Sequence, residues 1–251
     1  MGTLSHARDD HHGHAAVASA HENLLLAALP AGARQRIAFE RVEIEPEQAI
    51  YEAGADLTHY VFPLVGILSL VKDLDGDTIE VGTVGHEGMI GIPALLGVRT
   101  ATTRIFAQSP GVIERIGVDE LDAVMDTSAP TRRLLLRYAN AFHEEVSQSV
   151  ACNRLHSLEE RCARWLLITH DRTGSDVMYL KQRFLSYMLG VHRPAVSLAA
   201  SALQRAGIIS YKRGTITLLD RSALEEASCA CYRIGRDAYA RARLHPISLS
   251  S

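Results

Sequence analysis

The residues whose chemistry is most informative lie in one basic stretch of the chain. Residues 180–219 contain no aspartate or glutamate, and their six basic residues are Lys181, Arg183, Arg193, Arg205, Lys212 and Arg213. Arginine can bond guanine through two parallel hydrogen bonds, and both lysine and arginine pair with phosphates. Residues 40–126 carry the opposite charge, with sixteen acidic and five basic residues. A polyanion is therefore the expected partner of the basic stretch, and a solvated basic surface is the alternative.

The pattern of residues 184–203, FLSYMLGVHRPAVSLAASAL, predicts how part of this basic stretch is positioned. Small and apolar residues recur at helical spacing and are interrupted at Gly190, which can take the positive φ of a tight turn. Pro194 follows in the first turn of a second helix, where its missing N–H costs nothing. We predict a helix-turn-helix with helices over 181–188 and 192–205, and an ordinary helical hairpin is the alternative. The residues expected to pack the two helices together are Leu185, Leu189, Val191, Val196 and Ala199.

The second helix of such a motif presents its N-terminal end to the major groove of double-stranded DNA. Arg193 would then read a guanine, and Ser197, one turn later, would reach a base or a phosphate. Residues 207–219 alternate at strand period around Arg213-Gly214, which predicts a two-stranded wing whose tip contacts phosphates. The full set of expected DNA-contacting residues is Lys181, Arg183, His192, Arg193, Pro194, Ser197, Lys212 and Arg213.

Upstream of this motif, residues 40–118 consist of short β-rich runs separated by turn signals. Asp75-Gly76 lies between two such runs and predicts a two-residue hairpin turn. Several short strands with glycines at the corners predict an antiparallel β-roll or barrel. The fold class expected for the chain is therefore α+β, with an N-terminal antiparallel β-roll, a long helix and a C-terminal winged helix-turn-helix.

A long helix from Pro130 to about Asn153 connects the two parts. Five of its residues recur at 4,3,4,3 spacing and predict a homodimer interface: Leu135, Ala139, Phe142, Val146 and Ser149. The alternative is an amphipathic helix that packs on its own domain. Ser157 and Glu160 form a capping box, so a new helix starts there. The expected domains are a disordered His-rich tail (1–22), a β-roll (23–129), a dimerisation helix with hinge (130–156) and the winged helix-turn-helix (157–251).

Other reactive residues do not complete a site in the sequence. Cys229 and Cys231 form a CxC pair, but two thiolates rarely complete a metal site, so we expect buried, inert thiols and no metal or cofactor. The tail histidines could collect divalent metal, but a disordered segment is the favoured interpretation: His6, His11, His12, His14 and His21. The sequence has no nucleophile elbow, P-loop, HExxH or dinucleotide fingerprint, so we do not expect an enzyme. No apolar run approaches a membrane span, and four cysteines in 251 residues suggest no disulfide scaffold, so a cytoplasmic protein is expected.

With these elements in order, residues 23–240 resemble Crp/Fnr-type transcription regulators. Two segments are similar to those of an effector-orphan branch of that family: GHEGMIGIPALLG at 85–97 and DRSALEEASCACYRIGRD at 220–237. The resemblance implies a cyclic-nucleotide-binding-like β-roll and a homodimer that reads a palindromic operator. It further implies RNA polymerase as a partner and Arg193 as the base-reading arginine. The family often has glutamate at the following position, where this chain has Pro194.

The resemblance also bears on the effector. Cyclic-nucleotide binders in the family hold the phosphate with an Arg-Ser-Ala stretch, and this chain has Ala101-Thr102-Thr103 there, without an arginine. We therefore expect an effector other than cAMP. The residues of the candidate effector pocket are Glu87, Gly88, Met89, Arg99 and Arg104, where either arginine could replace the missing one. A competing function is a small-molecule sensor that uses its winged helix for protein contacts.

Overall fold

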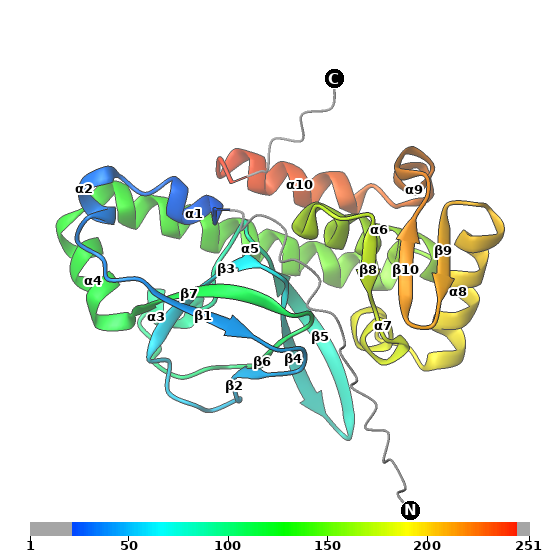
Figure 1. Ribbon diagram of the computed structural model, residues 1–251, viewed down its shortest axis with the longest axis horizontal. Coiled ribbons are helices and arrows are strands. Elements are labelled where there is room, and N and C mark those ends of the chain that lie inside the picture. The colour runs from blue at the N-terminus through cyan, green and yellow to red at the C-terminus, as the bar shows by residue number, and fades with distance from the viewer. Residues whose placement is uncertain (1–21, 245–251) are drawn as a thin grey trace, which may run out of the picture.

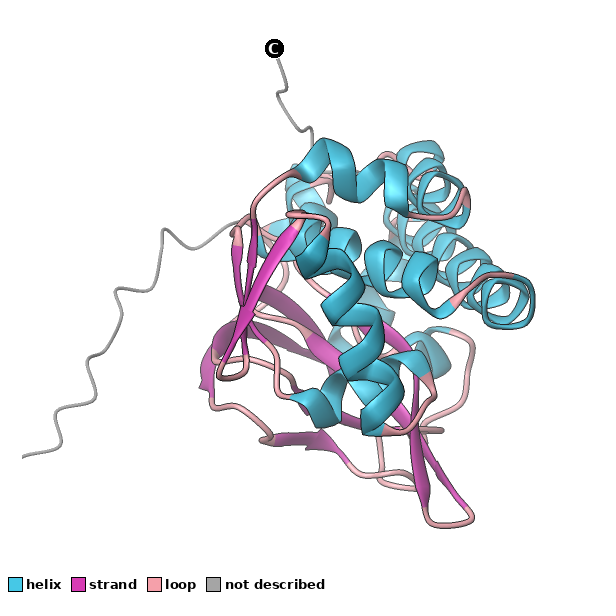
Figure 2. Ribbon diagram, turned by 90° about the vertical axis from the view of Figure 1, so that its right-hand side faces the viewer, coloured by secondary structure: helices cyan, strands magenta, loops and turns pink. Residues whose placement is uncertain are grey.

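The computed structural model describes residues 22–244, so the five tail histidines lie outside the described residues. Its fold is α+β, as predicted. Figure 1 shows a β-rich part, a helical part to its right that contains a small sheet, and a long helix, α5 (Ala129–Leu155), that joins them. From the side, the helices cover one flank of the strands (Figure 2). None of the described helices is long and apolar enough to cross a membrane.

The strands of the N-terminal part form two antiparallel sheets, as their short β-rich runs predicted. One sheet has the order β1-β7-β3 and the other β2-β6-β4-β5. Their bounds are β1 (Glu40–Ile44), β2 (Ala49–Tyr51), β3 (His59–Val65), β4 (Leu68–Leu74), β5 (Asp77–Val84), β6 (Arg104–Ala107) and β7 (Gly111–Gly117). Buried residues of both sheets, including Val61, Leu68 and Ile113, pack into one core, so the sheets close around it as a roll.

The β4–β5 hairpin turns as the sequence predicted. Asp75 and Gly76 have φ of 53° and 89°, the two successive positive values of a type I′ turn. The short helices of this half are α1 (Leu24–Ala27), α2 (Ala31–Arg34), α3 (Ile92–Leu95) and α4 (Val118–Thr127). They lie against the roll, and α4 leads directly into α5.

The long helix α5 faces its own protomer with part of the predicted dimer interface. Leu135 is 1% exposed within the core of the N-terminal half. The ring of Phe142 packs on β5, 2.8 Å from where a Cβ on Gly82 would lie. These two residues are therefore not available to a partner. The physical reason is that two neighbouring stripes of residues on one helix can have the same 3-4 spacing. In α5, the stripe that contains Leu135 and Phe142 packs against the β-roll.

The C-terminal part is built around a second hydrophobic core. Helix α6 (Leu158–Thr173) begins at the predicted capping box, where Ser157 and Glu160 bond each other's backbone N–H groups, and ends at Gly174 in the left-handed conformation. After it come β8 (Val177–Tyr179), α7 (Gln182–Leu189), α8 (Arg193–Arg205), β9 (Ile209–Lys212), β10 (Thr215–Leu218) and α9 (Arg221–Ala227). The last helix, α10 (Cys231–Arg241), returns alongside α5 (Figure 1).

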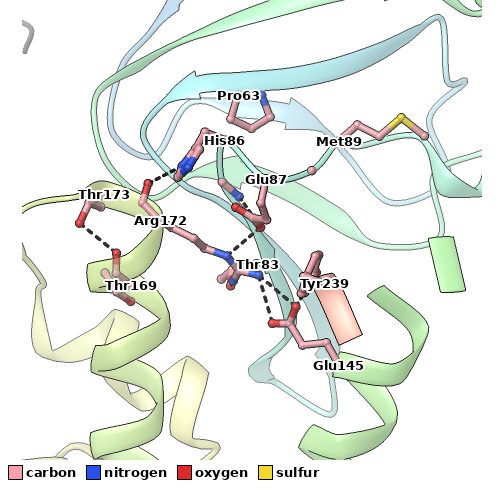
Figure 3. Close-up of polar contacts among 12 residues, drawn as sticks. Pro63, Thr83, His86, Glu87, Met89, Glu145, Thr169, Arg172, Thr173 and Tyr239 are labelled. Atoms are coloured by element: carbon pink, nitrogen blue, oxygen red, sulfur yellow. Dashed lines mark hydrogen bonds and ion pairs between the residues drawn. The ribbon is translucent and has the colours of Figure 1, made fainter. Parts of the chain in front are cut away.

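The contacts between the two parts include a pair of aromatic rings and a buried charged cluster. Phe184 of α7 stacks on Phe106 of β6, with ring centroids 5.8 Å apart. Deeper in the interface, Arg172 of α6 is 7% exposed and donates hydrogen bonds to Glu87 and Glu145 (Figure 3). These contacts fix how the helix-turn-helix sits against the β-roll.

Candidate nucleic-acid interface

The turn between α7 and α8 has the geometry expected of a helix-turn-helix. Gly190 has φ 59° and ψ 39°, and its N–H donates to the Ser186 carbonyl. A Cβ added at Gly190 would meet nothing within 4 Å, so glycine is needed there for its backbone conformation and not for space. His192 is the extended residue before α8, and Pro194 lies in the first turn, where no backbone donor is lost.

Packing between the two helices determines which face of α8 is outside. Leu185, Leu189, Val196 and Ala199 are each at most 2% exposed in one cluster, as predicted. The opposite face carries residues four positions apart: Arg193 and Arg205 are exposed, and Ser197 and Ser201 between them are half-buried. Leu198 on the same side is 69% exposed. This face is open over three helical turns, beginning at the first residue of α8. A helix that presents such a face can enter the major groove of DNA.

The serine of this face is held in place by two hydrogen bonds. Ser197 Oγ donates to the Arg193 carbonyl at 3.2 Å and accepts from Gln182 Nε2 at 3.2 Å. Gln182 belongs to the first turn of α7. It was not among the predicted DNA-contacting residues, although it lies next to the basic residues at 181 and 183. This contact fixes the Ser197 hydroxyl beside Arg193, where both side chains point away from the core.

The wing has three strands, whereas the alternating pattern of the sequence predicted two. Its order is β8-β10-β9, all antiparallel. The predicted Arg-Gly turn is present, because Arg213 and Gly214 have φ of 51° and 81°. The added strand, β8, is anchored by the Leu180 N–H, which donates to the Gly214 carbonyl at 2.7 Å. It has only three residues, too few for an alternating pattern to be recognised.

The basic residues of this region differ in how free they are. Arg193, Lys212 and Arg213 are exposed. Lys181, in contrast, pairs with Glu47 of the β1–β2 loop at 2.9 Å, and Arg183 pairs with the other oxygen of the same carboxylate. Hydrogen bonds from Lys181 and then Arg183 hold the pKa of Glu47 below its ordinary value. The acidic half of the chain thus neutralises two of the residues predicted to contact DNA.

A groove separates the β4–β5 hairpin from the start of α8. It is lined on one side by the hairpin turn, from Gly76 to Ile79, and on the other by residues from Val191 to Ala195. His192, Arg193 and Pro194 therefore face the hairpin across a gap.

The candidate effector residues do not form one pocket. Glu87 accepts from Arg172 Nε at 2.8 Å and lines a cavity with Arg172 and Tyr239 (Figure 3). Burial lowers the pKa of Arg172, the carboxylates of Glu145 and Glu87 raise it, and the net direction is upward, so the guanidinium stays charged. Gly88, Met89, Arg99 and Arg104 do not line this cavity.

The other four candidates have structural partners instead. Met89 is 1% exposed in the core, and its carbonyl accepts from Tyr138 Oη at 2.8 Å. Gly88 lies under the same tyrosine ring. The guanidinium of Arg99 is held by Asp119 and Asp122, and that of Arg104 by Asp73: the N–O distances are 2.9, 2.8 and 3.0 Å. Both arginines are therefore paired with carboxylates in this structure.

Comparison with known proteins also indicates a helix-turn-helix in the C-terminal part of the chain. Residues 160–227 match the family model described as a Crp-like helix-turn-helix domain. No curated protein sequence matches the chain. Among solved structures, FixK2 from Bradyrhizobium japonicum is 18% identical with a TM-score of 0.69, and the alignment covers 77% of this chain and 99% of that one.

Two further structures share the fold. A putative transcriptional regulator of the Crp/Fnr family from Eubacterium rectale is 21% identical with a TM-score of 0.64, over 82% of this chain and 99% of that chain. The c-di-GMP responsive global regulator CLP from Xanthomonas campestris is 14% identical with a TM-score of 0.60, over 76% and 100%.

A β-roll, a long helix and a winged helix-turn-helix are the parts of the fold that the chain has in common with these structures. Residues 160–227 are thus similar to Crp-like helix-turn-helix domains, and the chain shares its fold with these structures. The predicted effector-orphan branch stays a prediction.

Proposed function

We propose that the protein reads a palindromic operator as a homodimer, through the outer face of α8. The observation that carries this proposal is the exposed Arg193 at the first residue of α8, on a helix face whose opposite side is fully buried. From that position a guanidinium can form two hydrogen bonds with a guanine, while Ser197 reaches a neighbouring base or phosphate. His192 and Pro194 border the same end of the helix.

The wing and the first helix supply the contacts that are independent of sequence. Lys212 and Arg213 at the wing tip are proposed to neutralise phosphates. Lys181 and Arg183 are proposed to do the same after they exchange Glu47 for the DNA backbone. Operator binding therefore includes a movement of the helix-turn-helix away from the β1–β2 loop, which is the step that an effector or another signal can control.

We assign the dimer interface to a stripe of α5 that keeps two of the predicted residues and replaces each of the other three by the next residue in the sequence. Leu136, Ala139, His143, Val146 and Val150 repeat at 3,4,3,4 spacing. Leu136 and Val150 are 42% and 68% exposed, and Ala139 and Val146 belong to the originally predicted set. Ser149 of that set is held by Arg164 at 3.0 Å, so Val150 takes its place. Four apolar residues and His143 at this spacing on an open helix face are suited to a parallel coiled coil.

The test of the dimer uses analytical ultracentrifugation. The native protein is expected to sediment as a dimer, and Val150→Glu as a monomer, because a charge would be buried against its symmetry mate. Leu219→Glu places the same charge at an apolar residue that is 59% exposed outside α5, and it should leave the dimer intact. A dimeric Val150→Glu protein would argue against this interface.

The test of operator reading is selection from random duplex DNA. The native protein is expected to enrich a palindrome whose half-sites lie about one helical turn, ~34 Å, apart. Arg193→Ala should enrich this palindrome less strongly and lose the preference for the guanine that Arg193 reads. Arg36→Ala changes an exposed arginine two residues after α2, an element that lies opposite α8 in Figure 1, and it should enrich the palindrome as the native protein does. No enrichment by the native protein would favour the alternative in which the winged helix makes protein contacts.

RNA polymerase and a small-molecule effector other than cAMP remain the further partners we propose. The loop at Ala101–Thr103 has no arginine, and Arg99 and Arg104 are each held by carboxylates. Millimolar cAMP is therefore expected to leave the Tm unchanged. A cAMP-dependent rise in Tm would contradict this part of the proposal.

A further inference from the structure

Four possible metal ligands meet where α5 ends and α10 begins. Cys152 is in the last turn of α5 and His156 directly follows that helix, while Cys229 precedes α10 and Cys231 is its first residue. Cys152 Sγ lies 3.5 Å from Cys229 Sγ, and Cys231 Sγ lies 3.4 Å from His156 Nδ1. All four ligand atoms are within 4.8 Å of one another. The CxC pair that seemed incomplete in the sequence thus acquires two more ligands.

We infer that these residues form a tetrahedral Cys3His site for Zn²⁺. Zinc in closed structural sites takes four sulfur or nitrogen ligands, and Cys3His is one of its common sets. With about 2.3 Å to sulfur and about 2.0–2.1 Å to nitrogen, the edges of such a tetrahedron measure roughly 3.5–3.8 Å. The two short contacts, 3.5 and 3.4 Å, are close to this length. Because all four ligand atoms lie within 4.8 Å of one another, no pair would close by more than roughly 1.0–1.3 Å on binding.

The surroundings also suit a closed metal site. Cys152, Cys229 and Cys231 are each at most 5% exposed, so water has little access to the sulfur atoms. Gln148 Nε2 donates to Cys231 Sγ at 3.0 Å. Donors of this kind orient metal ligands and tune their basicity in known sites.

A buried cation lies beside the cluster. Arg164 is 8% exposed and its charge acts on Cys152, while its Nε has no hydrogen-bond partner among the described residues. Three thiolates and one Zn²⁺ carry one net negative charge. A zinc-bound cluster would therefore give Arg164 the counter-charge that a buried guanidinium needs.

The location gives the site a mechanical role. His156 and Ser157 form the hinge between α5 and α6, whereas Cys229 lies between α9 and α10 and Cys231 is the first residue of α10. A bound ion would tie the end of the dimerisation helix to the C-terminal segment and so fix the hinge that orients the helix-turn-helix. Loss of zinc is expected to increase amide hydrogen exchange on both sides of the hinge.

The test measures metal directly, without DNA, so its result is independent of the proposed operator reading. Full-length protein is freed of metal and titrated with Co²⁺, because thiolate ligands give intense charge-transfer absorption that imidazoles of the tail do not. We expect one Co²⁺ per chain with this absorption, displaced by one Zn²⁺. Cys152→Ser and Cys231→Ser should weaken or abolish it.

Two controls keep the test decisive. Cys162→Ser changes a cysteine of α6 that is 1% exposed but lies outside the cluster, and it should retain the full absorption. His156 is the partly exposed ligand, so His156→Ala is the substitution least expected to disturb folding. This variant should lose Co²⁺ to a chelator that the native protein resists. Native protein without the charge-transfer band, or with a Cys152–Cys229 disulfide or bound iron, would overturn the zinc assignment.

Discussion

At the scale of single residues, the chemistry of this protein depends on which side chains have partners. Arg193, Lys212 and Arg213 are free at the surface, whereas Lys181 and Arg183 share one carboxylate. Arg193 could be predicted from the sequence because its position next to the turn fixes its exposure. The pairing with Glu47 could not, since the two ends of that ion pair are 134 residues apart.

The same limit explains the cysteine cluster. Cys152 and Cys229 are 77 residues apart, and no local pattern indicates that α10 returns to the end of α5. One signal was present: Cys152 and His156 are four residues apart, which places both on one face of a helix end. Combined with a CxC pair, that spacing gives the four ligands of a zinc site.

Glu80 should make stability depend on pH. Burial raises its pKa from 4.5 to about 8, against hydrogen bonds from Ser69 and Trp165 that lower it. The folded state then holds a proton that the unfolded state releases, so the free energy of unfolding should fall as pH rises from 4.5 towards 8. Glu80→Gln should remove this fall in urea titrations at pH 5.5 and 8. Glu226→Gln changes an exposed residue of α9, and this variant should keep the fall in the free energy of unfolding. If this free energy changed equally with pH in both variants, the Glu80 carboxyl would not be buried.

At the scale of elements, local signals predicted most of the fold. The hairpin at Asp75-Gly76, the capping box at Ser157 and the turn at Gly190 are each specified by residues next to one another. The third wing strand, β8, and the choice of which face of α5 packs on the β-roll depend on contacts between segments that are far apart in the sequence. Leu135 and Leu136 are both apolar, so only the position of the β-roll decides which one is buried.

Gly190→Ala tests the turn. Because a Cβ there meets no atom, the cost is that of the positive φ alone, about 1–2 kcal/mol of unfolding free energy. Gly235→Ala is the matched control, since it also has open space but lies inside α10, where alanine should stabilise by about 0.5–1 kcal/mol. Chemical denaturation measures both. Changes of the same sign in the two variants would contradict the assigned conformation of Gly190.

At the scale of the whole molecule, a carboxylate of the acidic segment 40–126 pairs with basic residues of the segment 180–219. Glu47→Gln removes the carboxylate that holds Lys181 and Arg183, so DNA affinity should rise by roughly 2–5-fold, the range expected for exposed ion pairs. The gain should shrink at high salt because the pair is screened there. Fluorescence anisotropy measures it, with Glu45→Gln as an exposed neighbouring control. An unchanged affinity would mean that these ion pairs do not compete with DNA.

The central claim is that the outer face of α8 reads base sequence while the wing only holds the backbone. The most direct test compares the binding of Arg193→Ala and Lys212→Ala to the selected operator and to an unrelated duplex, over a range of salt. Arg193→Ala should lose about 1–3 kcal/mol of discrimination, and Lys212→Ala should weaken both duplexes alike and reduce the salt slope by about one. If Arg193→Ala kept its full preference for the operator, α8 would not be the reading helix and this account would be wrong.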